Sequence, residues 1–433
     1  MLKTKSKIGL TEAVAIGIGG MVGGGIFAVL GLAVELAKGG TPAAFLIAGI
    51  VAFITSYSYA KLSLKFPNTG GTVNFINQGF GKNIFSGGTN NLLWISYIVM
   101  LSLYSSAFGS YGAALFKITG DFSTDKHILI TAIIVFCTLL NYISFKVVSM
   151  TESVAVFIKI FILAIFAVIG LWGLNGNTNI HQLSLINWVG PFKLVSGGFV
   201  IFVAYEGFEL IANAAPSIKN PLKNIPAAFY ISVVFVIILY VIIAFITVGS
   251  VPFEKISKAQ EYVLALAAEP VLGKAGYIII SITALISTFS AINVSLYGGS
   301  RVNYELAEDD EMSHEFTTTL WNEPVGLIIT ALLTLVVANF FNLESISTSG
   351  SAGFLLIFAI VNIANFKLAK ETKANKWVSF IGALLCVSAL TALMYQQFTT
   401  NYTGALIGMT MILASYIIEF VYKKSEKKKT LSK

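Results

Sequence analysis

Glycines crowd one stretch near the start of the chain, where they occupy six of the nine positions from 17 to 25. The residues on either side are mostly apolar. Glycine lacks the side chain that supports a helix, so this run favours an unwound backbone within the segment. A close-packing face for a neighbouring helix is the alternative, and three consecutive glycines fit it less well. A break would expose backbone N–H groups suited to a carboxylate, those of Gly23, Gly24, Gly25 and Ile26.

A second irregular element lies near residue 200. Ser196-Gly197-Gly198 begins it, and the run from Ala204 to Glu209 places two carboxylates and a glycine near the middle of an apolar segment. Free backbone carbonyls around Val203 to Glu206 would suit an ammonium group. The two irregular elements together therefore match the two charges of a zwitterion.

Glu206 and Glu209 are three residues apart, so they share one face if the backbone there is helical. One of them is a candidate to offset a buried lysine or to accept a proton, and the other to favour cationic substrates. A structural ion pair or a water-facing position is an equally reasonable interpretation.

Lys159 falls inside a long apolar run, about seven residues into the segment 152–174. At 1.5 Å per residue, this depth is about 10 Å from the start of a helix. A lysine at the centre of a membrane helix costs about 2.5–3.5 kcal/mol. Burial disfavours the charged amine, which makes Lys159 a candidate to lose and regain a proton. The alternative is a side chain that reaches to the membrane surface.

Charged residues are scarce along the whole chain. The 433 residues include 28 Lys and Arg and 21 Asp and Glu, or 11% of the sequence, against about 25% in a soluble globular protein. Hydrophobic residues make up 56%, and mean hydropathy is +0.81. We therefore expect an all-α membrane protein. The net charge of +7 does not indicate nucleic acid binding, because no dense basic patch with interleaved aromatic residues is present.

Cysteines and histidines are few and dispersed. Cys137 and Cys386 each lie in an apolar run, which favours two buried thiols over a disulfide. His127, His181 and His314 fall in different loops or helix ends. The sequence therefore predicts neither a metal site nor a cofactor.

Apolar windows long enough to span a bilayer, about 20 residues each, recur twelve times. The first six are expected at 10–37, 42–64, 86–116, 127–148, 152–174 and 191–215. The second six are expected at 226–249, 270–301, 324–341, 345–366, 376–398 and 402–422. No loop is long enough to hold a soluble domain.

The two irregular elements fall in the first and the sixth of these spans. Because five is odd, spans one to five would run opposite to spans six to ten, which is the inverted-repeat plan of secondary transporters. We expect a tail at 1–9, five-helix repeats at 10–174 and 191–366, two further helices at 376–422 and a tail at 423–433. The last two helices could pack against a partner, so the chain is expected to be a monomer or a homodimer.

Basic residues divide unevenly between the two ends of the expected spans. Of the 28, twenty lie on the side of the termini, seven on the other side, and one, Lys159, within a span. The positive-inside rule then places both termini in the cytoplasm. We expect a multi-pass protein of the cell membrane.

Three motifs carry a resemblance to a known family. The run from Gly17 to Phe27 resembles the first-helix signature of the amino acid–polyamine–organocation (APC) superfamily, and Ala204 to Glu209 resembles its sixth-helix motif. Asn220 to Pro226 resembles the loop that follows. The similarity covers about 8–422 and extends to ApcT-like broad-specificity, proton-coupled amino acid transporters, including the lysine in helix five. It implies the leucine-transporter fold, a 5+5 inverted repeat with helices 1 and 6 broken, and alternating access.

The resemblance also implies roles for individual residues. The carboxylate contacts of the substrate fall on Gly23, Gly24 and Gly25, and its ammonium contacts on the carbonyls of Phe202, Val203 and Glu206. An aromatic gate falls on Phe202, with Tyr205 beside it. Many relatives have a hydroxyl or a methyl within the first-helix triplet, which is all glycine here. The acids that usually follow helix six are replaced by Ala215-Pro216.

For ion coupling, the resemblance places the Lys159 amine where sodium-coupled relatives bind Na⁺. Gly19 and Ser287 are its implied neighbours, with Thr288 and Ser290 nearby, and Glu209 matches a family acid.

Amino acid transport coupled to H⁺ and independent of Na⁺ is the resulting hypothesis, with exchange of amino acids or amines as the alternative. A channel would show rings of like charge or a repeated filter sequence. An enzyme would need a convergent acid, base or metal set. Neither pattern is visible, so the expected partners are an amino acid, protons and the lipid bilayer.

Overall fold

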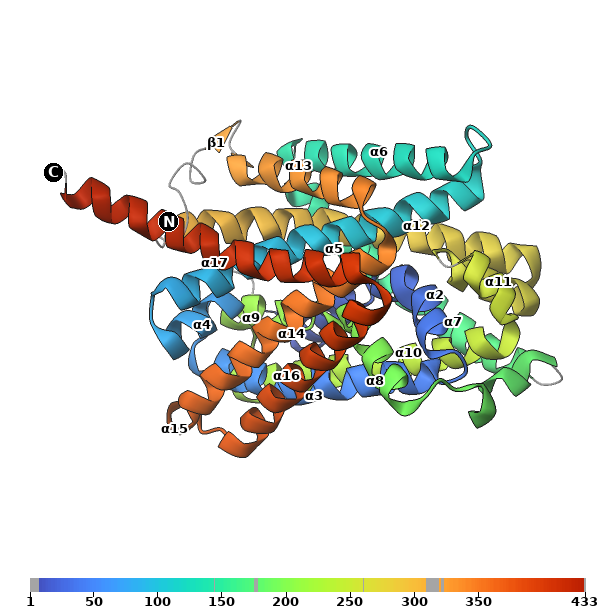
Figure 1. Ribbon diagram of the computed structural model, residues 1–433, viewed down its shortest axis with the longest axis horizontal. Coiled ribbons are helices and arrows are strands. Elements are labelled where there is room, and N and C mark those ends of the chain that lie inside the picture. The colour runs from blue at the N-terminus through green and yellow to red at the C-terminus, as the bar shows by residue number, and fades with distance from the viewer. Residues whose placement is uncertain are drawn as a thin grey trace.

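The computed structural model describes residues 8–143, 145–174, 178–259, 261–308, 319–320 and 323–431. Long helices dominate it, and most of them lie along the long axis of the molecule (Figure 1). The described part of the chain begins and α17 ends on the same side, at the left of Figure 1.

In the described part of the chain, nine helices are long and apolar enough to cross a membrane, and the count is eleven when each of two bent helix pairs is one span. The nine are α3 (Thr41–Lys65), α5 (Ile84–Phe116), α6 (Phe122–Ile143), α7 (Phe145–Gly173), α10 (Pro221–Ser250), α12 (Val263–Glu308), α14 (Leu343–Lys367), α16 (Lys376–Thr400) and α17 (Tyr402–Leu431). The remaining expected span corresponds to α13 (Val325–Phe340), which is apolar but has only 16 residues. Twelve full spans are therefore not reached on length alone.

The two bent pairs are the glycine-interrupted segments. The first pair, α1 (Leu10–Met21) and α2 (Gly25–Ala37), bends by 45°. The second bends by 52° between α8 (Pro191–Val200) and the segment 202–217, which contains η3 (Phe202–Tyr205), α9 (Leu210–Ala214) and η4 (Ala215–Ser217). Both predicted breaks are thus confirmed, and their separation by five spans is the arrangement of a leucine-transporter-type 5+5 repeat.

Two boundaries differ from the expectation. The gap between spans four and five was expected at 148–152, but α6 ends at Ile143 and α7 begins at Phe145. The sequence around this turn has no glycine or proline to mark it. The span expected at 270–301 begins earlier, because α12 starts at Val263 and kinks at Gly273, where φ is 67°.

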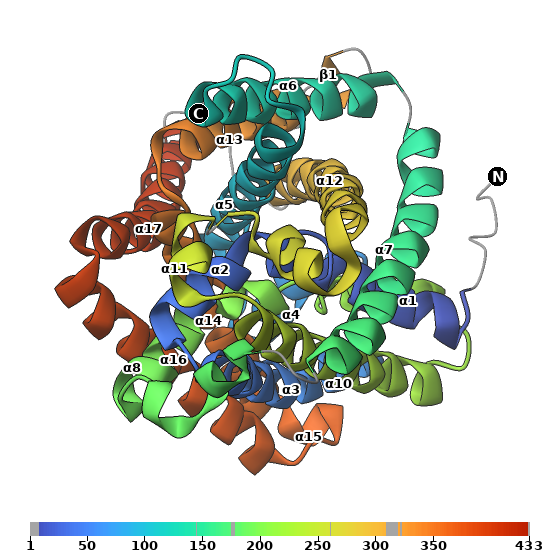
Figure 2. The ribbon, with the colours of Figure 1, turned by 90° about the vertical axis from the view of Figure 1, so that its right-hand side faces the viewer.

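Short elements connect the spans. They are α4 (Thr72–Phe80), η1 (Thr178–Leu183), η2 (Leu185–Asn187), α11 (Phe253–Lys258), α15 (Ala369–Thr372) and an antiparallel pair of two-residue strands, β1 (Thr319–Leu320) and β2 (Glu323–Pro324). Seen from the end opposite the termini, α2 lies near the centre of the molecule, among α3, α5, α10 and α12 (Figure 2).

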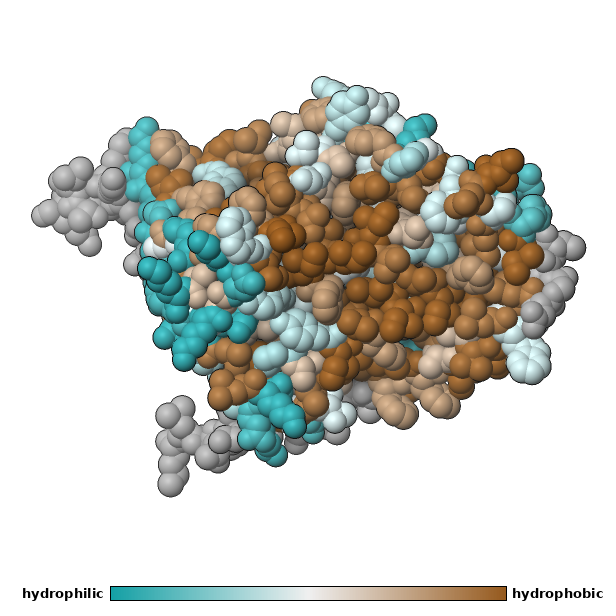
Figure 3. Space-filling model, turned by 90° about the horizontal axis from the view of Figure 1, so that it is seen from below, coloured by the Kyte–Doolittle hydropathy of each residue, from teal (hydrophilic) through white to brown (hydrophobic). Residues whose placement is uncertain are grey.

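The outer surface of the bundle carries the side chains expected against lipid. Large apolar residues are exposed on α3, α10 and α16, among them Ile50, Ile238 and Leu384. One face of the molecule is a broad apolar band, with hydrophilic residues gathered at one end (Figure 3). This pattern is that of a protein whose solvent is a bilayer.

A buried polar network fixes α16, which lies outside the repeat, to α3 and α14. The Asn362 side chain accepts a hydrogen bond from Ser58 (2.7 Å) and donates one to Thr55 (3.1 Å). Asn365 donates to Ser379 of α16 at 2.8 Å. These groups are buried and satisfy one another, so the three helices are held in one register.

Candidate functional site

The first interruption lies between α1 and α2, at residues 22–24. A side chain at Gly24 would overlap the ring of Tyr104 on α5, so only glycine fits that position. α2 begins at Gly25, and the N–H groups of its first turn have no carbonyl partner within the helix. The break therefore presents the type of group that can hold a carboxylate.

The second interruption follows the end of α8. Two hydroxyls of α14, those of Ser347 and Ser351, donate to the Val200 carbonyl, each at 2.8 Å. The N–H of Val203 donates to the Ser351 oxygen at 2.9 Å. Side chains of α14 thus replace the helical hydrogen bonds that the break removes, which explains how an unwound segment is stable in the core.

The two interruptions touch through their backbones. A Cβ on Gly20 would lie 2.6 Å from the carbonyl oxygen of Gly207, and a Cβ on Gly25 would lie 2.8 Å from the Cα of Ala204. The Tyr240 hydroxyl of α10 donates to the Met21 carbonyl at 2.7 Å and also lies 3.2 Å from the Ala204 carbonyl. One side chain therefore bridges both breaks.

Glu206 and Glu209 do not share a helical face. The backbone at Glu206 is extended, with ψ of 147°, and Gly207 has a φ of 115°, which only glycine adopts readily. The condition for the shared face is not met because the chain turns sharply between the two acids. Both are buried, and their carboxyl groups still interact. Glu206 accepts a hydrogen bond from the Tyr104 hydroxyl at 3.3 Å, and Glu209 from the Gly207 N–H at 2.8 Å.

Lys159 lies 14 residues from either end of α7, at the middle of the helix and fully buried. This depth is about 21 Å from the helix start, because α7 begins earlier than expected. Its Nζ donates to the carbonyl of Gly19 at 2.9 Å, near the C-terminal end of α1. Its amine is thus engaged inside the bundle, at the break of the first span.

Ser287 of α12 meets the same break from the other side. Its hydroxyl lies 2.9 Å from the Val22 carbonyl and also contacts the Gly23 carbonyl. Thr288 instead donates to Ala284 of its own helix at 2.7 Å, and Ser290 is buried nearby in sequence. The carbonyl end of the first break is thus held by a lysine of α7 and a serine of α12.

A cavity of about 540 Å³ lies beside both interruptions. Gly19 and Gly20 line it from the first break, and Glu206 and Gly207 line it from the second. It extends toward the side of the chain termini, where its wall includes Thr69, Gly70, Asn213, Ser295 and Val302. A small polar molecule in this cavity would contact a carboxyl group and backbone of both broken spans.

The residues expected as an aromatic gate lie outside that cavity wall. Phe202 packs against Phe358 of α14, with ring centroids 5.9 Å apart, and Tyr205 donates to the Phe45 carbonyl at 2.8 Å. Both side chains are fully buried. Their role as a gate stays a prediction.

The aromatic residues that line the cavity are Tyr97 and Tyr104 of α5. Sequence reasoning missed them and Tyr240, because a tyrosine within an apolar helix looks like any core aromatic residue. The only signal was the polar end of each side chain, which must find a partner when buried.

No three His, Cys, Asp or Glu side chains come together as a metal site within the residues that the structure describes. The site is built from backbone dipoles, hydroxyls, one amine and two carboxyls. Such groups are of the type that can hold a small charged molecule.

Known proteins are similar to this chain over nearly its whole length. A family model described as "Amino acid permease" matches residues 8–417. A Methanocaldococcus jannaschii protein described as uncharacterized is 34% identical over 99% of this chain and 97% of its own length. The inner membrane transport protein YbaT of Escherichia coli is 31% identical, with 97% of each chain covered.

Among solved structures, a manganese transporter mutant of Eremococcus coleocola superposes with a TM-score of 0.62 at 13% identity, covering 99% of this chain and 97% of that one. At that identity the likeness concerns the fold alone. The fold and the family matches each extend over nearly the whole chain.

Proposed function

The chain belongs to the amino acid permease family, and we propose that it moves amino acids across the cell membrane by alternating access, coupled to H⁺ and independent of Na⁺. The observation that carries the coupling is the Lys159 amine, buried at the middle of α7 and hydrogen-bonded to the Gly19 carbonyl at 2.9 Å. Because this amine is hydrogen-bonded to the broken helix, gain or loss of its proton changes the contact between α7 and α1.

The substrate is proposed to lie between the two interruptions. The N–H groups of Gly23, Gly24, Gly25 and Ile26 would hold its carboxylate, as the helix N-terminus there favours an anion. The carbonyls of Phe202, Val203 and Glu206 would hold its ammonium group. The adjoining cavity would be the route to one side of the membrane, and Tyr104, like Tyr240, reaches both breaks.

Coupling follows from where the proton sits. The protonated Lys159 places a positive charge at the C-terminal end of α1, where a helix stabilises a cation. Loss of the proton removes that charge and weakens the hold of α7 on α1. Because the substrate also binds at this break, proton and substrate act on one movable element, which is the requirement for coupled transport.

Glu209 is proposed as a second proton site, in addition to Lys159. Two interacting carboxyl groups in a buried setting resist ionising together. The Gly207 N–H supports a charge on Glu209, and the Tyr104 hydroxyl supports one on Glu206. With both termini in the cytoplasm, as proposed from the lysine distribution, the cavity opens to the cytoplasm.

Purified protein in liposomes tests the proposal. Uptake of a panel of labelled amino acids would be measured with an inward pH gradient, with an inward Na⁺ gradient, and with neither. Accumulation with the pH gradient alone is the expected result. Uptake that depends on preloaded amino acid and ignores the pH gradient would overturn H⁺ symport and establish exchange, and no amino acid flux in any condition would overturn the transport proposal itself.

A further inference from the structure

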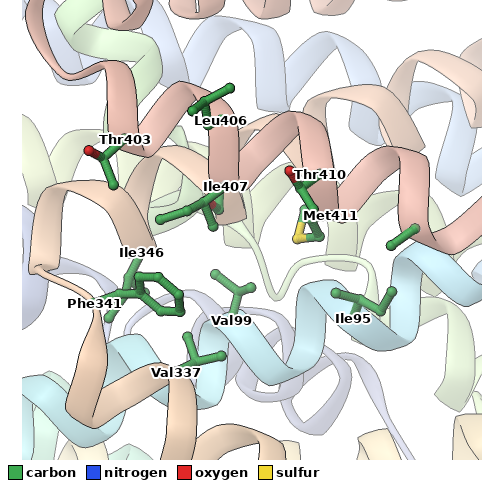
Figure 4. A pocket seen from close by; sticks show the side chains of 12 residues that line it. Ile95, Val99, Val337, Phe341, Ile346, Thr403, Leu406, Ile407, Thr410 and Met411 are labelled. Atoms are coloured by element: carbon green, nitrogen blue, oxygen red, sulfur yellow. The ribbon is translucent and has the colours of Figure 1, made fainter.

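A groove runs along the surface of the bundle between α17 and the pair α5 and α13, with its floor on α14. Its volume is about 450 Å³, and it is separate from the cavity beside the interruptions. Side chains from opposite walls point into it, such as Ile407 and Met411 from α17 and Val99 from α5 (Figure 4). We propose that this groove binds one acyl chain of a membrane phospholipid.

The lining of the groove selects hydrocarbon. Nine of its twelve lining residues are apolar, among them Ile95, Val99, Val337, Leu406 and Ile407, and the other three are Ser349, Thr403 and Thr410. The Ser349 hydroxyl in the floor is already committed to the Ser345 carbonyl at 2.8 Å. Water in such a groove would lack the two to four polar partners that hold a buried water.

The groove opens onto the lipid-facing surface of the molecule. Leu413 and Ile417 are exposed on α17, and Leu332 and Val336 are exposed on α13. These residues belong to helices that a bilayer surrounds, so the medium at the opening is lipid tails. The groove therefore continues an interface that the membrane already forms.

The length of the groove matches a single leaflet. Its α17 wall runs from Thr403 to Ala414, which is about 17 Å along a helix. Half of a bilayer's hydrocarbon core is about 15 Å thick. The groove begins at the end of α17 that lies away from the chain termini, so the bound chain belongs to the leaflet on that side.

A held lipid would differ from the surrounding ones because four helices enclose it. It would fill the space between α17 and α13, where the side chains of the two walls do not meet across the groove. An unfilled gap deprives its lining of dispersion attraction, and an acyl chain in the groove supplies it. The lipid then acts as part of the packing of α17 on the repeat.

Native mass spectrometry of the full-length protein in mild detergent tests this inference. Wild type is expected to retain one phospholipid. Ile407→Trp fills the groove and should lower that occupancy at least tenfold. Leu413→Trp places the same side chain on the exposed face of the same helix and should leave the occupancy unchanged. Equal occupancy in the two variants would overturn the proposal.

A photo-crosslinking measurement covers the case in which Ile407→Trp does not fold. Benzoylphenylalanine at Thr410, an exposed groove residue, would be irradiated in membranes. A phospholipid adduct on the protein supports the proposal. A cross-linked dimer without a lipid adduct would overturn it and identify the groove as an interface between two copies of the chain.

Discussion

The coupling proposal makes a quantitative prediction for Lys159, the lysine at the middle of α7. Lys159→Met keeps an unbranched side chain of similar length but removes the charge and the donor to the Gly19 carbonyl. Lys159→Arg keeps a charge that cannot be lost at any working pH. The two variants therefore remove the proton cycle in opposite ways.

The magnitude follows from one amine carrying one proton. A difference of one pH unit is worth about 1.4 kcal/mol per proton, which is a tenfold concentration ratio. With two units of pH difference and one proton per substrate, wild type should accumulate substrate about 100-fold. Lys159→Met should equilibrate the substrate at a ratio of about one. Lys159→Arg should also fail to accumulate it, with slower flux because α1 stays held.

The assay is the steady-state accumulation ratio in liposomes, measured as a function of the imposed pH difference. Lys258→Met removes an exposed lysine of α11 and serves as the matched control, with the wild-type slope expected. Thermal unfolding checks that each variant is folded. If Lys159→Met still accumulates substrate about 100-fold from the pH difference alone, Lys159 is not the coupling group and the reasoning fails.

Three further predictions concern packing and hydrogen bonds, two at the site and one in the network that joins α3, α14 and α16. Gly20→Ala would place a Cβ 2.6 Å from the Gly207 carbonyl oxygen. The resulting overpacking costs about 1–3 kcal/mol and should reduce the rate of transport by tenfold or more. The control is Gly190→Ala, which has open space around it and should leave uptake unchanged. Tyr240→Phe leaves two buried carbonyls without the bridging hydroxyl, which costs about 1–3 kcal/mol. The variant should therefore unfold at a lower temperature and take up substrate more slowly. An unchanged unfolding temperature contradicts the bridge. Asn362→Ala removes the centre of the network that joins α3, α14 and α16, and should lower the unfolding temperature more than Tyr240→Phe does, measured by the same thermal assay.

The sequence was informative where it places residue types inside a membrane span that are unusual there. Six glycines within one span and a lysine within another have no ordinary place in a membrane helix, so both stood out, and the structure brings Gly19 and Lys159 together. The membrane class and the broken helices were predictable for the same reason. These features violate a rule that the bilayer otherwise enforces.

Other features could not be predicted from the sequence because the residues involved look like ordinary residues of a hydrophobic core. Tyr104 and Tyr240 resemble any buried aromatic residue until their hydroxyls are seen at the two breaks. The boundary between α6 and α7 carries no glycine or proline, and its misplacement put Lys159 about seven residues into its helix, where the structure has 14. The relation of Glu206 to Glu209 depended on one positive φ at Gly207, which no pattern in the chain reveals.

The position of Lys159 also bears on how the chain is made. Between residues 155 and 173, α7 has twelve Leu, Ile, Phe and Val residues. At about 0.3–0.6 kcal/mol each, these favour insertion by about 4–7 kcal/mol. This exceeds the cost of a lysine even at the centre of a span, which is about 2.5–3.5 kcal/mol. The helix can thus enter the membrane as it leaves the ribosome, without help from helices still to be synthesised. The Gly19 carbonyl, which accepts the hydrogen bond from the Lys159 amine, lies 140 residues earlier in the chain. The first span is therefore synthesised before α7 and is available as its partner.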